Sequence, residues 1–514
     1  MSIFLSFYLG HDASVAVSMD GNIKYRKFER IHGIKHQKGN FNFVSKALDD
    51  WKIKLKDIKC IAYSDGDRSG LGKCSKKELF CKGQLKKLGL DIKSFNIDHH
   101  FAHILSSWPV IPTVNTDYGV CIDGKGDNEK STTVIKNLTT NPEVVYEEFG
   151  SSVGLEFRAI AGLMGFSASA KETRETGAVG IDFAGKIMGL QAYSEDQIKE
   201  FGLPKLLELD VNSNRINEYV KNYKYMSPEM FRCREMIKKG FYKTYSEWHN
   251  FWLNYILKNT FASLDKKSII SYSGGCVQNT VFNYRIKKEF PNLFPIPHCY
   301  DGGIPLGCLE FLRLYFGENQ FDCIGFPYWQ DDNIIQRPTD KTIKLMAKML
   351  NENKIIGWIQ GSGELGPRAL GNRSILMSPI NKSNKDEINK KVKMREPWRP
   401  FAGSVLQENS SSYFDMNQSK YMLYACKVLD EKKIPAITHV DRTCRIQTVE
   451  EPDNPCFYQL IKEYKNLSGV PVLLNTSFNV MGKPIVSLKK QCLEINGVDA
   501  IVFGNEIIKT NIKI

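Results

Sequence analysis

The chain has 514 residues, of which 42% are hydrophobic, a size and composition that accommodate two to three folded domains and exclude a disordered chain. Its 70 Lys and Arg residues outnumber 57 Asp and Glu residues, which gives a net charge of +13. No apolar run approaches the roughly 20 residues of a membrane-spanning helix. The first residues lack the basic flank of a signal peptide, so we expect a cytoplasmic protein with no membrane partner.

The predicted elements begin with strands at residues 3–9 and 13–17, a turn at 20–22 and a strand at 23–28. Residues 114–122 and 132–135 repeat this strand–turn–strand pattern around a glycine-rich turn at 123–127. A third copy starts with a strand at 269–273, followed by a glycine pair and a helix from Val277. A strand and a tight turn, repeated in two halves, are typical of actin-like ATPases.

Between these copies, residues 195–265 show helical periodicity. Residues 318–337 are expected to form a linker, and a second α/β domain opens with a helix at 341–350 and a strand at 355–359. We therefore predict domains at 1–320 and 338–514.

The thirteen cysteines include no C-x-x-C pair. An odd number of scattered cysteines in a chain without an export signal predicts reduced thiols rather than disulfides.

The basic residues are concentrated in two segments. Between Lys52 and Lys93 there are 12 basic and 5 acidic residues, and between Lys382 and Arg399 there are 7 and 3. Two interpretations stay open: a solvated lysine-rich face, or a surface for a polyanionic acceptor such as nucleic acid.

A first candidate site starts from His99 and His103, whose i, i+4 spacing on a helix points both imidazoles in one direction. His100 would point about a third of a turn away and is not expected to be a ligand. Asp123 ends a predicted strand, and Asp301 opens a glycine turn before a helix. Two histidines and two carboxylates suit iron, manganese, zinc or magnesium, although many such histidine pairs bind no metal.

The glycine pair Gly274-Gly275 follows a predicted strand. Free amides at the start of a helix can hold phosphate oxygens, but glycine pairs also end strands for steric reasons alone.

A second candidate site is marked by the stretch Gly363 to Ser374, and further by segments 395–401 and 475–479. Glycines let the backbone approach a ligand closely, and arginines supply forked donors for oxyanions.

Together these motifs resemble the O-carbamoyltransferases of nodulation and antibiotic tailoring. In the second half the matching segments are 366–374, 392–402, 439–447 and 475–479; in the first half they are 10–14, 99–103, 123–127 and 184–192. Ala184 replaces a family glutamate, which leaves that corner of the pocket undefined. The resemblance implies an N-terminal actin-like (Kae1-like) domain and a C-terminal YrdC-like α/β domain.

The resemblance also implies a two-step reaction. The C-terminal domain would make carbamoyl-adenylate from ATP and carbamoyl phosphate, and the N-terminal domain would transfer the carbamoyl group to an acceptor hydroxyl. His11 is the expected catalytic base. The expected ligands of one divalent metal ion are His99, His103, Asp123 and Asp301. The expected nucleotide-binding residues of the N-terminal domain are Gly124, Lys186, Gly274, Gly275, Asn279 and Gly302.

In the C-terminal domain, the expected contacts to ATP, carbamoyl phosphate or the adenylate are Arg368, Arg373, Lys393, Arg399, Thr443, Arg445, Asn475 and Ser477. Arg368 and Arg373 have a second interpretation, in which they order the glycine loop. Lys35 and His36 are assigned to the acceptor or to phosphate.

The acceptor stays open between 5-hydroxymethylcytosine in DNA and the hydroxyl of a sugar, nodulation factor or antibiotic. Transfer of threonylcarbamoyl to tRNA and a non-catalytic actin-like ATP switch are further alternatives. The oligomeric state is also open, a homodimer among the possibilities.

Overall fold

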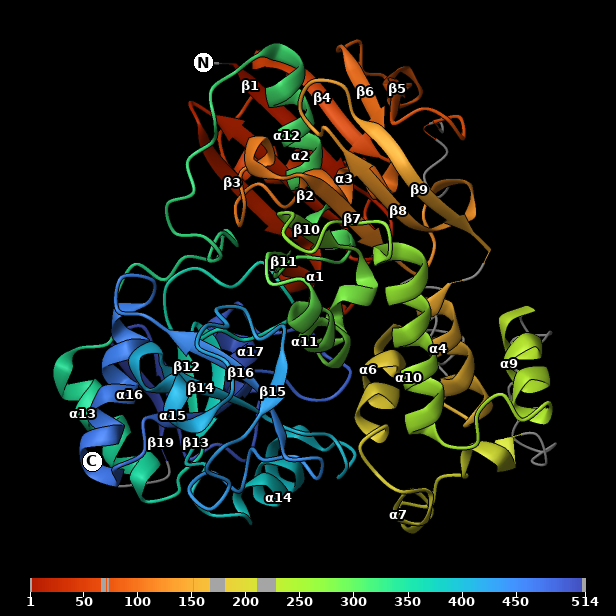
Figure 1. The fold of residues 1–514 in the computed structure, drawn as a ribbon. Helices are drawn as coiled ribbons and strands as arrows, with labels where there is room; N and C mark the ends of the chain where they lie inside the picture. The colour runs from red at the N-terminus through yellow and green to blue at the C-terminus, as the bar shows by residue number, and fades with distance from the viewer. Residues whose placement is uncertain are drawn as a thin grey trace. The chain divides into compact units, whose positions relative to one another are not determined.

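The computed structural model describes residues 2–65, 71, 74–150, 152–166, 181–209 and 228–510 (Figure 1). The chain divides into two compact units. The first comprises residues 1–21 and 36–320, and the second comprises 22–35 and 321–514. Residues 22–35, expected in the first domain, are grouped with the second unit, although their strand β3 (Asn22–Lys27) extends the first sheet next to β2 (Ser14–Met19).

The first unit contains two sheets with the same core topology. In the first sheet, β1 (Ile3–Tyr8) pairs antiparallel with β2 (Ser14–Met19) and parallel with β4 (Ile58–Ser64). Strand β4 continues in parallel to β6 (Ser94–Ile97), and β5 (Phe80–Lys82) lies antiparallel at the edge.

In the second sheet, β7 (Tyr118–Ile122) takes the place of β1. It pairs antiparallel with β8 (Lys130–Lys136), which continues to β9 (Glu143–Phe149), and parallel with β10 (Ile270–Ser273), which continues to β11 (Leu293–Pro295). The predicted repetition of strand and turn is confirmed, and it brings the loops after the parallel strands β7 and β10 to one edge of the sheet.

Helix α12 (Ile304–Phe316) packs on β1, β2 and β4 and against α3 (His99–Leu105), while α4 (Val153–Leu163) packs against α6 (Ile181–Leu190) and α9 (Pro228–Lys238). The predicted helical character of residues 195–265 is confirmed for the described part. Further α-helices in the described part of this unit are α2 (Phe41–Asp50), α7 (Glu195–Glu200), α10 (Tyr245–Ile256) and α11 (Thr280–Glu289).

The second unit is built on an eight-stranded mixed sheet in the order β15-β16-β14-β17-β13-β12-β18-β19 (Figure 1). These strands are β12 (Ile356–Ile359), β13 (Arg373–Met377), β14 (Ala402–Leu406), β15 (Ala425–Lys427), β16 (Thr443–Val449), β17 (Val472–Ser477), β18 (Ala500–Phe503) and β19 (Glu506–Thr510).

Helices α13 (Asp340–Asn351) and α16 (Pro455–Ser468) pack together beside this sheet, which confirms the predicted helix and strand at its start. The remaining elements of this unit are β3 (Asn22–Lys27), α1 (Phe28–His32), α14 (Asn384–Ile388), α15 (Ser410–Tyr413) and α17 (Lys489–Leu493).

Two local predictions were wrong. The helix predicted from Val277 begins at Thr280, because the side chain of Asn279 accepts a hydrogen bond from the Phe282 amide and caps the helix there. The strand predicted from Val114 begins at Tyr118, because Thr113–Asn115 form a short 3-10 turn.

All thirteen cysteines are free, as the sequence predicted. Within the described ranges, none of the helices combines the length and apolarity needed to cross a bilayer.

Candidate metal centre and anion site

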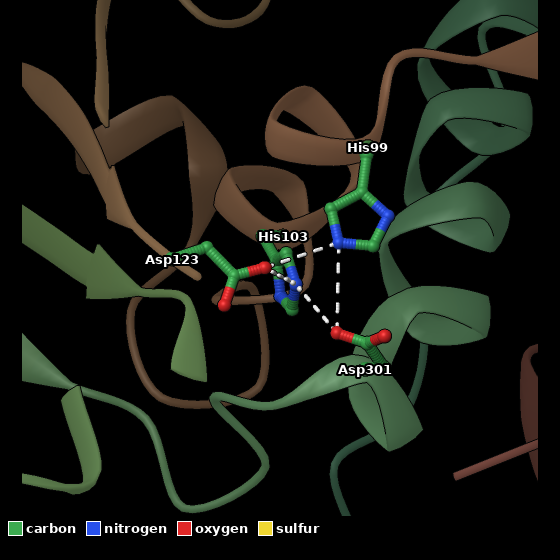
Figure 2. Close-up of side chains that lie close together, drawn as sticks. All are labelled: His99, His103, Asp123 and Asp301. Carbon is green, nitrogen blue, oxygen red and sulfur yellow. Dashed lines mark hydrogen bonds and ion pairs between the residues drawn. The ribbon is translucent and has the colours of Figure 1, made fainter. Parts of the chain in front are cut away.

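His99 and His103 lie one turn apart on α3, which starts where Asp98 accepts a hydrogen bond from the Phe101 amide. Both imidazoles are buried, and their ring centroids are 4.8 Å apart (Figure 2). The predicted i, i+4 geometry is confirmed. His100 turns away, and its Nδ1 lies 2.8 Å from Oγ1 of Thr133, as its position in the turn predicted.

Asp123 and Asp301 complete a cluster with the two histidines. Oδ2 of Asp123 lies 3.2 Å from Nε2 of His99 and 3.6 Å from Nε2 of His103, and Oδ1 of Asp301 lies 3.5 Å from both (Figure 2). One ligand atom from each of the four buried residues falls within 4.8 Å of all the others. The structure thus brings together the four residues that the sequence analysis grouped.

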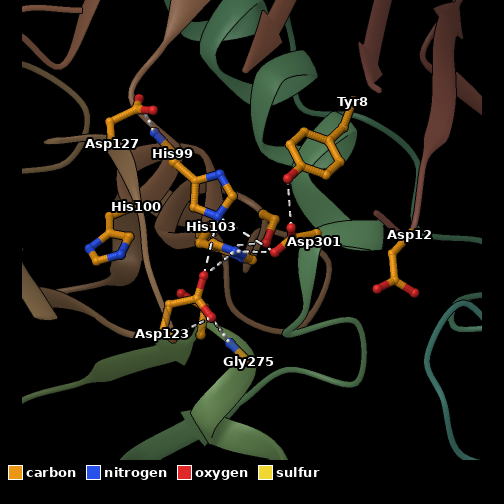
Figure 3. A network of polar contacts seen from close by, with 12 residues as sticks. Tyr8, Asp12, His99, His100, His103, Asp123, Asp127, Gly275 and Asp301 are labelled. Carbon is orange, nitrogen blue, oxygen red and sulfur yellow. Dashed lines mark hydrogen bonds and ion pairs between the residues drawn. The ribbon is translucent and has the colours of Figure 1, made fainter. Parts of the chain in front are cut away.

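Each aspartate has its second oxygen held by the protein (Figure 3). Oδ1 of Asp123 accepts hydrogen bonds from the amides of Gly124 at 2.7 Å and Gly275 at 3.0 Å. Oδ2 of Asp301 accepts a 2.7 Å hydrogen bond from the Tyr8 hydroxyl and lies 3.2 Å from Nε2 of His11. These contacts fix which oxygen of each carboxylate faces the histidines.

The four groups polarise one another strongly. Burial acts to raise the pKa of the Asp123 carboxyl, but the neighbouring imidazoles of His103 and His99 hold that pKa well below its usual value. Burial likewise opposes ionisation of Asp301, whereas the charges of His11 and His99 lower its pKa well below the usual value. Two ionised carboxylates therefore face the imidazole nitrogens.

These residues fit a divalent cation. Among the described residues, neither ring nitrogen of the buried His103 has a hydrogen-bond partner. Buried polar atoms are rarely left unpaired, and a cation between the two imidazoles and the two carboxylates would pair Nε2 of His103, which faces Asp123 and Asp301. Mixed nitrogen and oxygen ligands suit the first-row transition metals and zinc.

His11 is held beside this cluster by a second carboxylate. Its Nδ1 lies 3.0 Å from Oδ2 of Asp12, and the same carboxylate lies 3.0 Å from Nδ1 of His36. A carboxylate on Nδ1 favours the tautomer in which Nε2 carries the lone pair. His11, a predicted site residue, thus presents Nε2 toward Asp301.

The glycines near the cluster meet two different demands. Gly274 has φ +93°, and a Cβ atom there would lie 2.3 Å from the carbonyl oxygen of Ile122. A Cβ on Gly275 would lie 2.8 Å from Oδ1 of Asp123. The steric interpretation of this glycine pair therefore applies. The amide of Gly275 donates to Asp123 of the candidate metal centre. Open space surrounds Gly124, and the carbonyl of Gly302 accepts a hydrogen bond from Ser14.

Two predicted nucleotide contacts are engaged elsewhere. The Asn279 amide nitrogen lies 3.2 Å from Nε2 of His249 while its oxygen caps α11. Nζ of Lys186 lies over the rings of Phe166 and Phe183 at 4.9 and 5.0 Å.

The second unit gathers a group of cations that we call the arginine cluster: Arg368, Arg395, Arg399 and Arg445. Burial and the charges of Arg368 and Arg395 hold the pKa of the Arg445 guanidinium well below its usual range. Burial and the charge of Arg399 do the same for Arg395. Partly buried guanidiniums that repel one another could hold a polyanion.

Lys393 lies next to this cluster. Its buried Nζ donates to the carbonyl oxygens of Ser477 and Asn479, both at 2.8 Å, and to Oδ1 of Asn479 at 2.6 Å. Burial and the charge of Arg395 lower its pKa well below the usual value. Lys393 therefore joins the 477–479 turn to the arginine cluster.

The glycine- and arginine-rich loop is organised from inside. Oε1 of Glu364 accepts hydrogen bonds from the amides of Leu370, Asn372 and Arg373 at 2.8 to 3.1 Å. Arg373 is fully buried, pairs with Asp332 at 3.0 Å and donates to four backbone carbonyls. Of the two interpretations of Arg373, the geometry favours the structural one.

The remaining predicted residues of the second unit line the same sheet. The Asn475 amide donates to the carbonyl of Ala369 and to Ser404, and the Ser477 hydroxyl donates to Asn479. The hydroxyl of Thr443 donates to Asp441. The side chains of Asn475, Ser477 and Thr443, predicted to contact a ligand, thus donate hydrogen bonds to other groups of the protein.

The sequence analysis did not single out Tyr8, Arg395 or Glu364. Arg395 lies in segment 395–401, which marked the second candidate site. Tyr8 and Asp301 are 293 positions apart, and no local sequence pattern connects them.

Two family models match this chain. Residues 66–308 match the carbamoyltransferase N-terminus and residues 347–510 the carbamoyltransferase C-terminus. The nodulation protein NolNO of Sinorhizobium fredii is 28% identical, over 97% of this chain and 79% of that protein. The 3'-hydroxymethylcephem-O-carbamoyltransferase of Amycolatopsis lactamdurans is 24% identical, over 81% of each chain.

Among solved structures, full-length HypF in its phosphate- and nucleotide-bound form aligns with a TM-score of 0.36 and 15% identity, covering 62% of this chain and 56% of that chain, a likeness too low to support an argument. The two family models, together with these curated relatives, are decisive: the chain is an enzyme of the O-carbamoyltransferase family found among nodulation and cephem-modifying proteins.

Proposed function

We propose that this carbamoyltransferase uses ATP and carbamoyl phosphate to make carbamoyl-adenylate in its C-terminal unit and transfers the carbamoyl group to an acceptor hydroxyl in its N-terminal unit. The observation that carries the proposal is the presence, in one chain of this family, of an arginine cluster in one unit and a metal centre with an adjacent histidine in the other. The N-terminal unit would be an actin-like (Kae1-like) domain and the C-terminal unit a YrdC-like domain.

The arginine cluster suits the first step. ATP and carbamoyl phosphate are both highly anionic, and Arg368, Arg395, Arg399 and Arg445 offer enough positive charge to hold them together. Water and carbamoyl phosphate give carbamate and phosphate, and carbamate then attacks the α-phosphorus of ATP and displaces pyrophosphate. Positioning the two anions in register would supply much of the rate enhancement.

The metal centre suits the second step. His99, His103, Asp123 and Asp301 would hold a divalent ion, which supplies Lewis acidity to an oxygen of the adenylate. His11 would take the proton of the acceptor hydroxyl on Nε2 as the new C–O bond forms and AMP leaves. Asp12 supports this role, because it keeps the proton of the neutral imidazole on Nδ1.

The acceptor would be an alcohol. The cephem enzyme, by its name, carbamoylates a hydroxymethyl group, and a small molecule of this kind is one candidate. A hydroxymethylated base in DNA is the second, favoured by a surface of the first unit that combines exposed aromatic rings and lysines. Phe80 and Tyr315 are 42% and 48% exposed, and Nζ of Lys93 lies 5.0 Å from the Tyr315 ring centroid. Single-stranded nucleic acid binds to such surfaces by stacking and charge.

The test is incubation with ATP, carbamoyl phosphate and DNA containing 5-hydroxymethylcytosine, followed by nucleoside mass spectrometry. A gain of one carbamoyl group on that nucleoside identifies both reaction and acceptor. Pyrophosphate release with an unmodified nucleoside would keep the adenylation step and move the search to small alcohols.

Two other functions make different predictions in the same assay. A non-catalytic ATP switch would release no pyrophosphate in response to carbamoyl phosphate. An enzyme of tRNA threonylcarbamoylation would require threonine and bicarbonate in place of carbamoyl phosphate.

A further inference from the structure

The segment Asn22–Lys35, comprising β3 and α1, is part of the C-terminal unit although it lies near the start of the chain. We call it the N-terminal strap. The chain contributes to the first unit up to Gly21 and again from His36, so the strap is an excursion of 14 residues, of which β3 also extends the first sheet next to β2. An excursion of this kind needs contacts that compensate for its ordering entropy.

The first half of the strap binds the segment that precedes the second unit's sheet. Arg26 pairs with Asp331 at 2.6 Å, and the Asp331 amide donates to the Tyr25 carbonyl. The Lys27 amide donates to the side chain of the buried Gln330, whose own amide donates to the carbonyl of Gly363. These contacts connect the strap to the beginning of the glycine- and arginine-rich loop.

Arg30 reaches the loop itself. Its Nη2 donates to the carbonyl oxygens of Glu364 and Gly366 at 3.3 and 3.2 Å, on the two sides of Leu365 and two residues before Arg368. The Arg30 side chain is only 1% exposed, and the carbonyl of Arg30 accepts a hydrogen bond from Gln491. In the described part of the chain, no carboxylate pairs with this guanidinium.

A buried guanidinium that donates only to carbonyls is costly to maintain unless it performs a task. Both of its hydrogen bonds are with the loop that carries Arg368, and the Glu364 carboxylate holds the same loop through three backbone amides. The loop is thus fixed between one buried anion and one buried cation.

The end of the strap approaches the anion site as well. The charge of Lys35 is among the causes that lower the pKa of Lys393, after burial and the charges of Arg395 and Arg399. Lys35 is only partly exposed.

We propose that the N-terminal strap is a component of the C-terminal anion site, in which Arg30 is a positioning residue that sets the loop bearing Arg368. This inference rests on the proposed function of that site in binding ATP and carbamoyl phosphate. It predicts that adenylate formation in the C-terminal unit depends on residues 22–35, which lie far before residues 321–514 in the sequence.

The experiment uses the full-length protein and three variants: Arg30→Met, Arg30→Lys and Lys35→Met. Lys24→Met is the matched control, because it removes one charge from the same strap at a side chain that pairs with none of the described residues. Pyrophosphate binding is measured by calorimetry, and carbamoyl-phosphate-dependent pyrophosphate release gives KM and kcat. Metal content reports on the integrity of the first unit.

We expect Arg30→Met to weaken pyrophosphate binding and raise KM by about tenfold or more, with metal content unchanged. Arg30→Lys should recover most of the loss, since an ammonium can also donate to two carbonyls. Lys24→Met should match the wild type. Wild-type binding by Arg30→Met would overturn the positioning role.

Lys35→Met tests the strap even if Arg30→Met does not fold, because Lys35 is not a core residue. A severalfold loss of pyrophosphate affinity in Lys35→Met supports the proposal. Wild-type affinity would contradict the claim that the end of the strap belongs to the anion site. Failure of the proposed function is distinguishable: wild-type protein would then bind pyrophosphate but release none from ATP with carbamoyl phosphate.

Discussion

Asp123 and Asp301 are held in matching ways on opposite sides of the His99–His103 pair. Each offers one oxygen to the imidazole nitrogens, and each has its other oxygen fixed by hydrogen bonds from the protein. The donors differ: Asp123 is fixed by the amides of Gly124 and Gly275, which no substitution removes cleanly, whereas Asp301 is fixed by the Tyr8 hydroxyl. The Asp301 side of the centre is therefore the one that mutation can probe.

Tyr8→Phe should weaken metal binding about 10- to 100-fold, because the ring stays in place while the hydroxyl that orients Asp301 is lost. The measurement is a competition titration of Mn²⁺ or Zn²⁺ against a chelator of known affinity.

Tyr63→Phe is the matched control, since the buried Tyr63 hydroxyl donates to the Leu71 carbonyl rather than to the cluster. It should reduce thermal stability slightly and leave metal affinity unchanged. Equal metal affinities for Tyr8→Phe and wild type would show that the hydroxyl does not orient Asp301.

Asp12→Asn should slow carbamoyl transfer by about 100-fold or more, because an amide at this position no longer favours the Nε2 lone pair of His11. Pyrophosphate release from ATP and carbamoyl phosphate should continue at the wild-type rate, because it belongs to the other unit. Rapid-quench measurement of both steps separates them, and a parallel loss of pyrophosphate release would argue against the assignment of Asp12 to transfer.

Arg445→Met should impair ATP binding, whereas Arg373→Met should destabilise the fold. Arg445 lies among other arginines, so its removal should raise KM for ATP by at least about tenfold while leaving the melting temperature unchanged or higher. Arg373 is an interior cation paired with Asp332, and its loss should cost about 3–5 kcal/mol of unfolding free energy. Denaturant unfolding and steady-state kinetics on both variants test the contrast, which an unstable Arg445→Met protein would contradict.

His249 should make the first unit acid-sensitive. Burial is the main reason that its pKa falls from 6.5 to about 3. Below pH 6.5 the imidazole of His249 is protonated in the unfolded chain but stays neutral in the folded protein. The free energy of unfolding therefore falls as the pH drops through 6.5. From pH 6.5 to 5 this site should contribute a loss of roughly 2 kcal/mol.

His249→Gln keeps an acceptor for the Asn279 amide and removes the titrating group. Its unfolding free energy should depend less steeply on pH between 6.5 and 5 than that of the wild type. Identical slopes in denaturant titrations would show that His249 does not titrate in this range.

The local part of the fold was predictable, because it depends on neighbouring residues. The first hairpin, the helical spacing of His99 and His103 and the glycine turn at Asp301 all follow from short patterns, and the structure has them. The start of α11 was misplaced by three residues because the capping role of Asn279 was read as a ligand contact.

The supports of the two sites could not be predicted, because they join residues distant in sequence. Tyr8 reaches Asp301, and Arg30 reaches Glu364 and Gly366 across more than three hundred residues. The sequence also could not assign different roles to the two arginines of one motif: Arg368 joins the partly buried arginine cluster, while Arg373, five positions later, is fully buried.

The most direct test of adenylate formation is to follow α-labelled ATP with carbamoyl phosphate in His11→Ala protein, without an acceptor. The account predicts pyrophosphate release and a labelled, hydroxylamine-sensitive carbamoyl-adenylate, since His11 serves only the transfer step. Release of labelled ADP instead, or no cleavage between the α- and β-phosphates with or without carbamoyl phosphate, would contradict it.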